Sequence, residues 1–173
     1  MARIHEHCGW DDLRFPFTRD RLGVADKPDY DFTEHGLLFP QNDATEIIHI
    51  SDQMPHRWKI GSSVRPHLHF VQDEAQVSVW KIDYRWYDNE GDPTVAFASG
   101  VANTGFAFTY SSGSILQIAT WAAIDLSAIS GLSAFFDIRV YRDDNVVAGD
   151  ILGKGFDIHY IHDSIGSAEE YVK

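Results

Sequence analysis

Two histidines that stand two positions apart, His67 and His69, are the residues whose type and spacing could carry chemistry. Side chains along a β-strand alternate between its faces, so a strand here places both imidazoles on one face and Leu68 and Phe70 on the other. Two imidazoles on one face can converge on a single metal ion. They can also bridge neighbouring strands through hydrogen bonds, because a neutral imidazole has one donor and one acceptor.

The residues around this pair resemble the first metal-binding motif of the cupins, which are jelly-roll proteins. Five residues separate Gly61 from His67, and four separate His69 from Glu74. The glycine that ends that motif is missing, and the second cupin motif has no match downstream. His159, in FDIHY, is a candidate third ligand by residue type alone. We therefore predict no metal, and we assign a structural role to the pair His67 and His69.

Other groups of reactive side chains lack the neighbours that catalysis needs. The serines of 111–114 lie in a turn without a G-x-S-x-G context. The acidic pair 143–144 also lies in a turn, where acidic residues are common. The segment GKG at 153–155 lacks the rest of a phosphate-binding loop. We therefore expect no enzymatic activity and no cofactor.

Tryptophan side chains suggest a different function, because indole rings can stack on sugars. A carbohydrate-binding module would use exposed rings, and four tryptophans come into question: Trp58, Trp80, Trp86 and Trp121. Trp80 and Trp86 follow the period-two pattern of a strand that packs its aromatic face on a core. This alternative therefore depends on the exposure of Trp58 and Trp121.

The elements that must position these residues are short strands separated by polar turns. Alternating or apolar runs occur near 47–50, 67–70, 77–86, 95–99, 106–110, 115–124, 134–141 and 156–162. No amphipathic helical pattern persists, and short strands at regular spacing are typical of antiparallel sandwiches and barrels. We predict an all-β fold, an antiparallel jelly-roll β-sandwich, because a jelly roll places about eight strands in two sheets.

Residues 1–45 differ from the rest of the chain. Charged residues alternate irregularly with aromatic ones, prolines interrupt the segment, and no helical or strand period persists. Disordered tails rarely contain so many aromatics. We predict an extended N-terminal arm that lies along a surface, either the protein's own or a neighbour's, followed by a jelly-roll domain at 46–173. The expected attachment residues of the arm are Phe15, Phe17, Tyr30, Phe32 and Phe39.

Composition limits the classes of function. A chain of 173 residues is long enough for one domain with a core. A formal net charge of −12 without a basic cluster disfavours nucleic-acid binding. The single cysteine, Cys8, excludes an intrachain disulfide. The N-terminus lacks a secretory pattern and no apolar run could span a bilayer, so we expect a protein that is made and folds in the cytoplasm.

Several longer segments resemble a family of virion proteins of tailed bacteriophages. They are GLLFPQNDATE (36–46), DQMPHRWKIGSSVRPHLHFVQ (52–72), VWKIDYRWYDNEGD (79–92) and FDIHYIHDSIGSAEEYVK (156–173). The shared features are an aromatic residue, a lysine and a glycine before the H-x-H run, and a final histidine-bearing strand before a Gly-Ser turn. The resemblance covers nearly the whole chain and implies a β-sandwich structural protein without catalysis. It also implies a common structural role for His67, His69 and His159.

Together, these observations predict a non-enzymatic virion protein, most concretely a capsid decoration or cement protein that stabilises the head lattice. Its expected partners are further copies of itself, with a homotrimer favoured, and the major capsid protein or other virion proteins. Subunits of this kind usually assemble with closed cyclic symmetry. The alternatives are a tail or head–tail connector component, a cupin-like metalloprotein and a carbohydrate-binding module.

Overall fold

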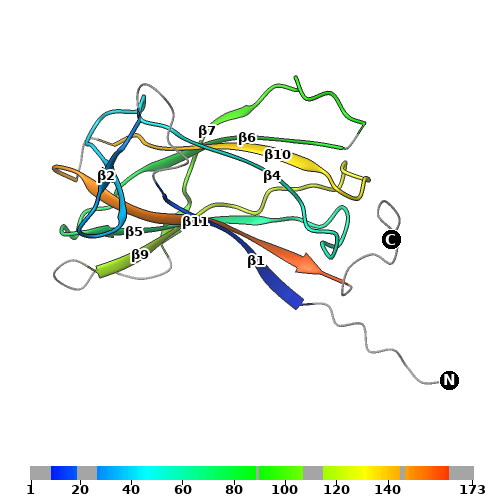
Figure 1. Cartoon of the computed structure of the whole chain (residues 1–173), viewed down its shortest axis with the longest axis horizontal. Helices are drawn as coiled ribbons and strands as arrows, with labels where there is room; N and C mark the ends of the chain where they lie inside the picture. Colours follow the sequence, from blue (N-terminus) through cyan, green and yellow to red (C-terminus); the bar gives the residue numbers. More distant parts are fainter. Residues whose placement is uncertain (1–8, 19–26, 89, 107–114, 145–146, 164–173) are drawn as a thin grey trace.

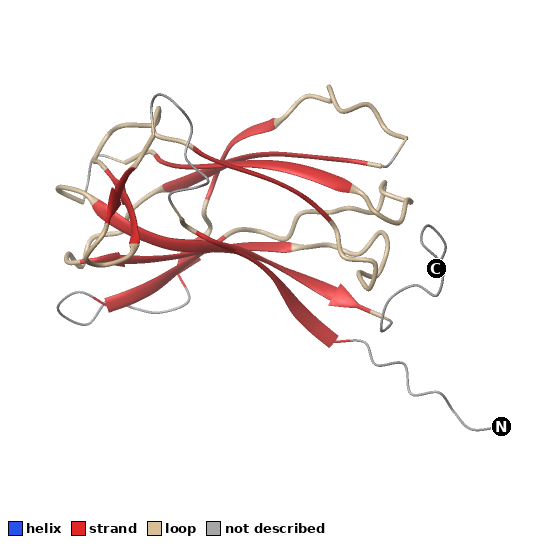
Figure 2. Ribbon diagram, in the orientation of Figure 1, coloured by secondary structure: helices blue, strands red, loops and turns tan. Residues whose placement is uncertain are grey.

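The fold consists of β-strands in two layers, as Figures 1 and 2 show. A computed structural model describes residues 9–18, 27–88, 90–106, 115–144 and 147–163, and these contain eleven strands and no helix. The described part of the chain therefore has no helix that could cross a membrane. All paired strands are antiparallel, which confirms the predicted all-β class.

The larger layer is a seven-stranded sheet built around the long strand β11. In spatial order it contains β2 (Asp29–Asp31), β3 (Gly36–Phe39), β11 (Ile151–His162), β5 (Arg65–Gln72), β9 (Ile115–Thr120) and β8 (Gly105–Phe106). The seventh strand, β1 (Gly9–Pro16), pairs with β11 beyond the end of β3. The second layer is β4 (Ile48–Gln53), β10 (Phe135–Arg142), β6 (Trp80–Tyr87) and β7 (Ala98–Ala102).

Consecutive strands repeatedly change sheet, which is the connectivity of a jelly roll. The chain crosses between layers from β3 to β4, from β4 to β5 and from β5 to β6, again from β7 to β8, and finally from β9 to β10 and from β10 to β11. The last strand, β11, lies next to the first strands, β1 and β3. The predicted jelly-roll sandwich is therefore confirmed.

Large apolar side chains from both sheets fill the space between the layers. Trp80 is fully buried, with its ring centroid 5.0 Å from that of Phe39 and 5.5 Å from that of Phe70. Trp86 stacks on Phe136 at 5.3 Å. Because strands alternate their faces, the period-two pattern correctly placed the aromatic face of β6 and the apolar face of β5 on the core.

The predicted N-terminal arm is wrong for the part of 1–45 that the structure describes. β1 runs alongside β11 from Gly9 opposite His162 to Pro16 opposite Gly155. Phe15 is 1 % and Phe17 is 3 % exposed, so both belong to the core. β1 is an edge strand, and a proline at its end is compatible with pairing on one side only. Pro16 therefore obscures the strand in the sequence, although β1 pairs with β11 up to and including this residue.

Two more of the expected attachment residues also lie in the sandwich. Phe39, in β3, is buried, and Tyr30, in β2, is partly buried against the core. Phe32 alone among the five is a surface residue, 68 % exposed, with its ring 5.0 Å from that of Tyr30. An attachment role for Phe15, Phe17 and Phe39 is therefore wrong, because their side chains are already used to fold this chain.

A buried ion pair joins the end of β10 to β3 and to the loop before β11. Arg142 has no exposed surface, and its Nε donates to Asp144 Oδ2 at 2.9 Å while Nη2 donates to Oδ1 at 3.2 Å. The remaining donors reach the carbonyl oxygens of Phe39 (2.9 Å), Gly149 (2.6 Å) and Val147. All five N–H groups of the guanidinium therefore have an acceptor.

Candidate functional site

The predicted histidines lie on the outer face of the seven-stranded sheet, where three strands bring polar side chains together. His67 and His69 point outward from β5, because Leu68 and Phe70 point into the core. In the register of the sheet, Asp157 of β11 lies opposite His67, and Asp12 of β1 lies opposite His159. The sheet therefore brings together residues that lie up to 147 positions apart in the sequence.

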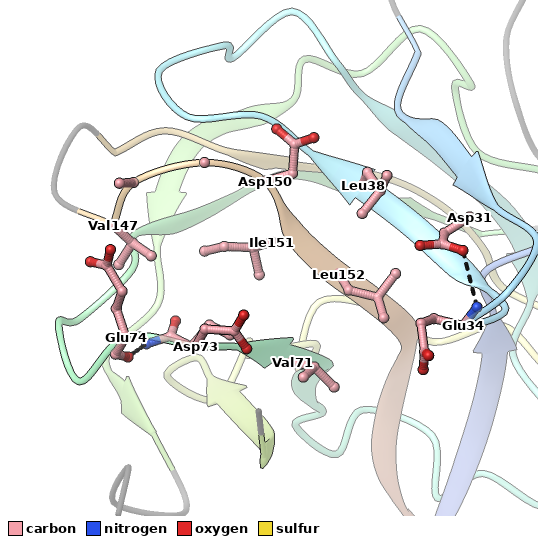
Figure 3. A pocket seen from close by; sticks show the side chains of 13 residues that line it. Asp31, Glu34, Leu38, Val71, Asp73, Glu74, Val147, Asp150, Ile151 and Leu152 are labelled. Carbon is pink, nitrogen blue, oxygen red and sulfur yellow. Dashed lines mark hydrogen bonds between the residues drawn. The ribbon is translucent and has the colours of Figure 1, made fainter. Parts of the chain in front are cut away.

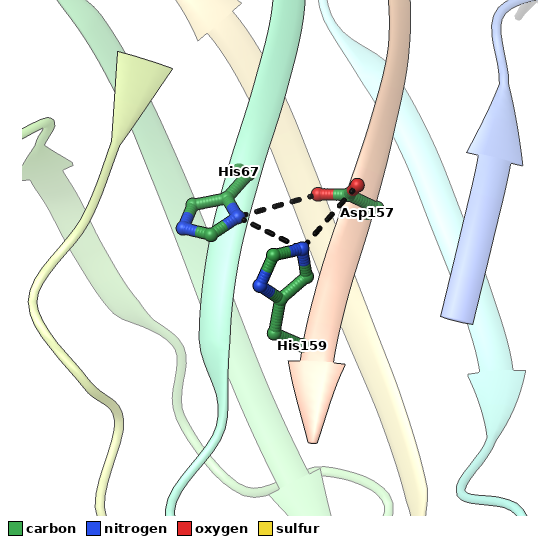
Figure 4. Close-up of side chains that lie close together, drawn as sticks. All are labelled: His67, Asp157 and His159. Carbon is green, nitrogen blue, oxygen red and sulfur yellow. Dashed lines mark hydrogen bonds and ion pairs between the residues drawn. The ribbon is translucent and has the colours of Figure 1, made fainter. Parts of the chain in front are cut away.

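Two histidines and one aspartate form the centre of this group, which we call the histidine–aspartate cluster (His67, Asp157, His159 and Asp12; Figure 4 shows the first three). His67 Nδ1 lies 3.2 Å from His159 Nε2 and 3.7 Å from Asp157 Oδ1. His159 Nε2 lies 3.7 Å from Asp157 Oδ2 and 3.0 Å from Asp12 Oδ1. The facing atoms are all nitrogens or oxygens that can donate to, accept from or ligate a common partner.

Two further side chains hold the carboxylates in place. His69 Nε2 hydrogen-bonds Asp157 Oδ2 at 3.0 Å, and Arg14 Nη2 donates to Asp12 Oδ2 at 2.9 Å. Each carboxylate is thus fixed through one oxygen, while its other oxygen faces a histidine of the cluster. His69 therefore supports the cluster from the side and is not one of its central residues.

Burial affects two residues of the cluster: it keeps solvent from the carboxylate of Asp157, and it lowers the pKa of His67. Asp157 is only 6 % exposed, and its Oδ1 makes no hydrogen bond to any residue of the described chain. Burial lowers the pKa of His67, and the nearby His159 lowers it further, against the opposing effect of Asp157. A lowered pKa favours the neutral imidazole. Neutral His67 has an unprotonated ring nitrogen that can accept a hydrogen bond or bind a metal ion.

A hollow of about 710 Å³ adjoins the cluster on the same face of the sheet. Pro16 of β1 and Leu116 of β9 form part of its apolar lining, and Lys154 and Gly155 of β11 also border it. His69, Asp157, His159 and Asp12 line it too. The outer face of the larger sheet therefore combines a polar cluster with an adjacent, partly apolar depression.

Glu74, the acidic residue of the cupin-like motif, is not part of this arrangement. It lies beyond the end of β5, in a separate hollow of about 700 Å³ that Figure 3 shows. That hollow is lined by several acidic side chains, among them Asp73 and Asp150, and by none of the three histidines. A carboxylate that follows the strand cannot reach the histidine face, so the cupin-like ligand set His67, His69 and Glu74 does not form.

The sequence prediction found the three histidines and missed both aspartates. His159 does join His67, although only residue type and the resemblance had pointed to it. Asp157 stands two positions before His159, so the D-x-H of β11 shares a face in the same way as the H-x-H of β5. That repeat was a usable signal. Asp12 could not be recognised, because its position depends on the pairing of β1 with β11.

The tryptophans named as candidate sugar platforms are not available for stacking. Trp58 and Trp121 are buried, as are Trp80 and Trp86. The indole of Trp121 donates to the carbonyl oxygen of Val101 at 2.9 Å, which fixes the ring inside the sandwich. A carbohydrate-binding role through Trp58 and Trp121 therefore has no support in the structure.

Comparison with known proteins does not place the chain in a family. No protein-family model matches it, and no curated protein matches its sequence. Among solved structures, latent PorU from Porphyromonas gingivalis matches 90 % of the chain with 6 % identity and a TM-score of 0.40, and infectious bursal disease virus matches 92 % with 13 % identity and a TM-score of 0.41. The CBM22-1-GH10 modules of Clostridium thermocellum xylanase 10B match 93 % with 11 % identity and a TM-score of 0.40.

The chain covers 13 %, 33 % and 28 % of those three structures, in the same order, and so corresponds to only a part of each. The three proteins differ from one another in kind.

Proposed function

We propose that this protein is a non-enzymatic structural component of a tailed-bacteriophage virion, and more specifically a decoration protein that binds and stabilises the capsid lattice. The resemblance of four sequence segments to such proteins supports the proposal, as does the jelly-roll sandwich that the resemblance implies. In this proposal the protein acts as a homotrimer on the virion, and its main partner is the major capsid protein.

The observation that carries the proposal is the outer face of the seven-stranded sheet, where large apolar side chains are exposed among the described residues. Trp10 of β1 is 56 % and Leu116 of β9 is 53 % exposed, and both point away from the core. The hollow beside the histidine–aspartate cluster lies on the same face and includes Leu116 in its lining. Large exposed apolar side chains rimmed by polar ones are typical of protein interaction sites. Trp is also among the residues that contribute most to binding energy.

This face takes over the attachment role that the sequence analysis gave to the N-terminal arm. Phe15, Phe17 and Phe39 are buried and have no surface to offer a partner. Arg65 lies over the exposed ring of Trp10, with its guanidinium carbon 5.6 Å from the ring centroid. An aromatic residue held in place by a neighbouring cation loses less side-chain entropy on binding than a mobile one.

The test is binding to phage capsids that lack this protein, measured by co-sedimentation with the purified full-length chain. We expect the double variant Trp10→Ala, Leu116→Ser to fold normally and to lose most of its binding. The matched control is Phe135→Ser, which removes a 38 % exposed phenylalanine from the outer face of the other sheet. Equal binding by all three proteins would overturn the proposed docking face. Localisation of the chain to the tail in a virion reconstruction would replace decoration by the tail or connector alternative.

A further inference from the structure

We propose that the histidine–aspartate cluster is a binding site for one divalent transition-metal ion of the zinc class, with His67, His159, Asp157 and Asp12 as its ligands. This inference does not depend on the proposed virion function. It differs from our sequence-based prediction of no metal, because that prediction considered a ligand set containing Glu74, whereas the fold supplies Asp157 and Asp12.

The separations of the ligand atoms suit a tetrahedral ion. With bonds of about 2.0–2.1 Å to nitrogen and oxygen, a tetrahedral zinc ion keeps its ligand atoms about 3.3–3.4 Å apart. In the cluster, His67 Nδ1 and His159 Nε2 are 3.2 Å apart, and His159 Nε2 and Asp12 Oδ1 are 3.0 Å apart. Asp157 presents its two oxygens at 3.7 Å from these nitrogens. The distances lie on both sides of the tetrahedral value, so small side-chain rotations are sufficient.

The buried carboxylate of Asp157 points to a missing partner. Its Oδ1 is removed from solvent and accepts no hydrogen bond from the described residues, and His67 Nδ1 lies 3.7 Å away, beyond hydrogen-bond distance. A buried carboxylate oxygen without a partner is costly. A metal ion between Asp157, His67 and His159 would provide that partner.

The surroundings of the ligands also resemble those of metal sites. Ligating carboxylates and histidines are usually held by a further layer of hydrogen bonds that fixes their orientation. Here His69 holds Asp157 through Oδ2, and Arg14 holds Asp12 through Oδ2. Both aspartates therefore keep one oxygen for the cluster. Two imidazoles with carboxylates form a ligand set that suits zinc and similar first-row ions better than calcium or magnesium.

Hydrogen bonds alone explain the cluster less completely. Protons can join His69 to Asp157 and His159 to Asp12, as the distances of 3.0 Å show. The nitrogens of His67 and His159 that face each other can share only one proton, and Asp157 Oδ1 still has no donor among the described residues. A bound cation satisfies all of these atoms together.

Such an ion would connect three strands. β1 pairs only with β11 in the described chain, and Asp12 lies in the middle of β1. A metal held by Asp12, by Asp157 and His159 of β11, and by His67 of β5 would tie this edge strand to the centre of the sheet. The inferred role is stabilisation, because metal binding to a folded site adds to the stability of the fold.

The experiment is zinc binding by the full chain, purified without a histidine tag and stripped with a chelator. We expect isothermal titration and native mass spectrometry to show one zinc ion per chain. We also expect zinc to raise the melting temperature and to slow amide hydrogen exchange in β1. Both His67→Ala and His159→Ala should abolish these effects. Cobalt in place of zinc should give the strong visible absorption of a tetrahedral site.

Two controls make the result specific. His49→Ala removes an exposed histidine from β4 of the other sheet and should leave zinc binding unchanged. His5, His7 and Cys8 also have side chains that bind zinc, and they stand outside the described residues. Because we place the site at the histidine–aspartate cluster, we expect the triple variant His5→Ala, His7→Ala, Cys8→Ser still to bind one ion. The inference is overturned if wild type binds no zinc, if binding survives in both His67→Ala and His159→Ala, or if only the triple variant loses it.

Discussion

The Arg142–Asp144 pair and the histidine–aspartate cluster each contain a buried aspartate. They differ in whether the oxygens of that aspartate have hydrogen-bond partners. In the interior, every N–H of Arg142 has an acceptor, and both oxygens of Asp144 accept hydrogen bonds. On the outer face, Asp157 is nearly as buried as Asp144, yet one of its oxygens has no donor in the described chain. We call the interior pair closed, because all of these atoms have hydrogen-bond partners. We call the histidine–aspartate cluster open, because one oxygen of Asp157 has no donor in the described chain.

The difference separates structural from functional roles. A buried charge with all partners present within the chain contributes to the fold and has nothing left for a ligand. A buried carboxylate with one oxygen that accepts no hydrogen bond in the described chain, beside two histidines whose ring nitrogens face each other, retains the capacity to bind a ligand. Strongly perturbed or incompletely paired polar groups on an accessible face are for this reason candidates for functional sites.

The largest expected effect concerns the interior as a whole, to which the first 45 residues contribute Phe15, Phe17 and Phe39. A chain truncated to 46–173 loses β1, β2 and β3, together with three core phenylalanines. We expect no cooperative unfolding transition for this fragment in circular dichroism, since loss of one core phenylalanine alone costs about 3–5 kcal/mol. Phe32→Ala, at an exposed position, should change stability by less than about 0.5 kcal/mol. A fragment that melts like wild type would restore the arm interpretation.

The second prediction tests the closed group directly. Asp144→Asn leaves the guanidinium of Arg142 buried without its counter-charge, and we expect a loss of about 3–5 kcal/mol in the free energy of unfolding, measured with urea. The control is the neighbouring Asp143→Asn, which breaks a partly exposed ion pair with Lys81 and should cost less than about 1 kcal/mol. Similar losses in the two variants would show that the buried ion pair contributes no more to stability than the partly exposed one.

A smaller effect should appear in acid. Burial alone would raise the pKa of Asp144, but the hydrogen bonds and charge of Arg142, with the amides of Val147 and Val79, lower it below 3.8 overall. A lowered folded-state pKa stabilises the fold above the unfolded value and loses that contribution as pH falls through the folded value. Wild type should therefore lose stability below about pH 4 more steeply than Asp144→Asn. Parallel curves for the two proteins would contradict this assignment.

The sequence was sufficient for the sandwich because its strands alternate clearly. Trp80 and Trp86 in β6, and Leu68 and Phe70 in β5, follow the period of two that places one face on the core. The first strands were missed for a physical reason. β1 contains charged residues and ends in Pro16, so its sequence does not look like a strand. Its apolar residues pair with residues of β11 that lie more than 140 positions later in the sequence.

The site divides in the same way. The H-x-H of β5 and the D-x-H of β11 are local patterns, and each predicts a shared face. Their convergence depends on the register that sets Asp157 opposite His67, and the contribution of Asp12 depends on the register of β1. Register between strands distant in sequence is determined by the whole core, so a local pattern cannot specify it.

The most direct test of the distinction between closed and open groups is the free energy of unfolding of Asp157→Asn and wild type, each measured without metal and with saturating zinc. Without metal, we expect the variant to be within about 1 kcal/mol of wild type or more stable, because it removes an incompletely paired buried charge. With zinc, only wild type should gain stability. A loss of about 3 kcal/mol or more in the metal-free variant, with no gain for wild type in zinc, would show that Asp157 is a structural group like Asp144.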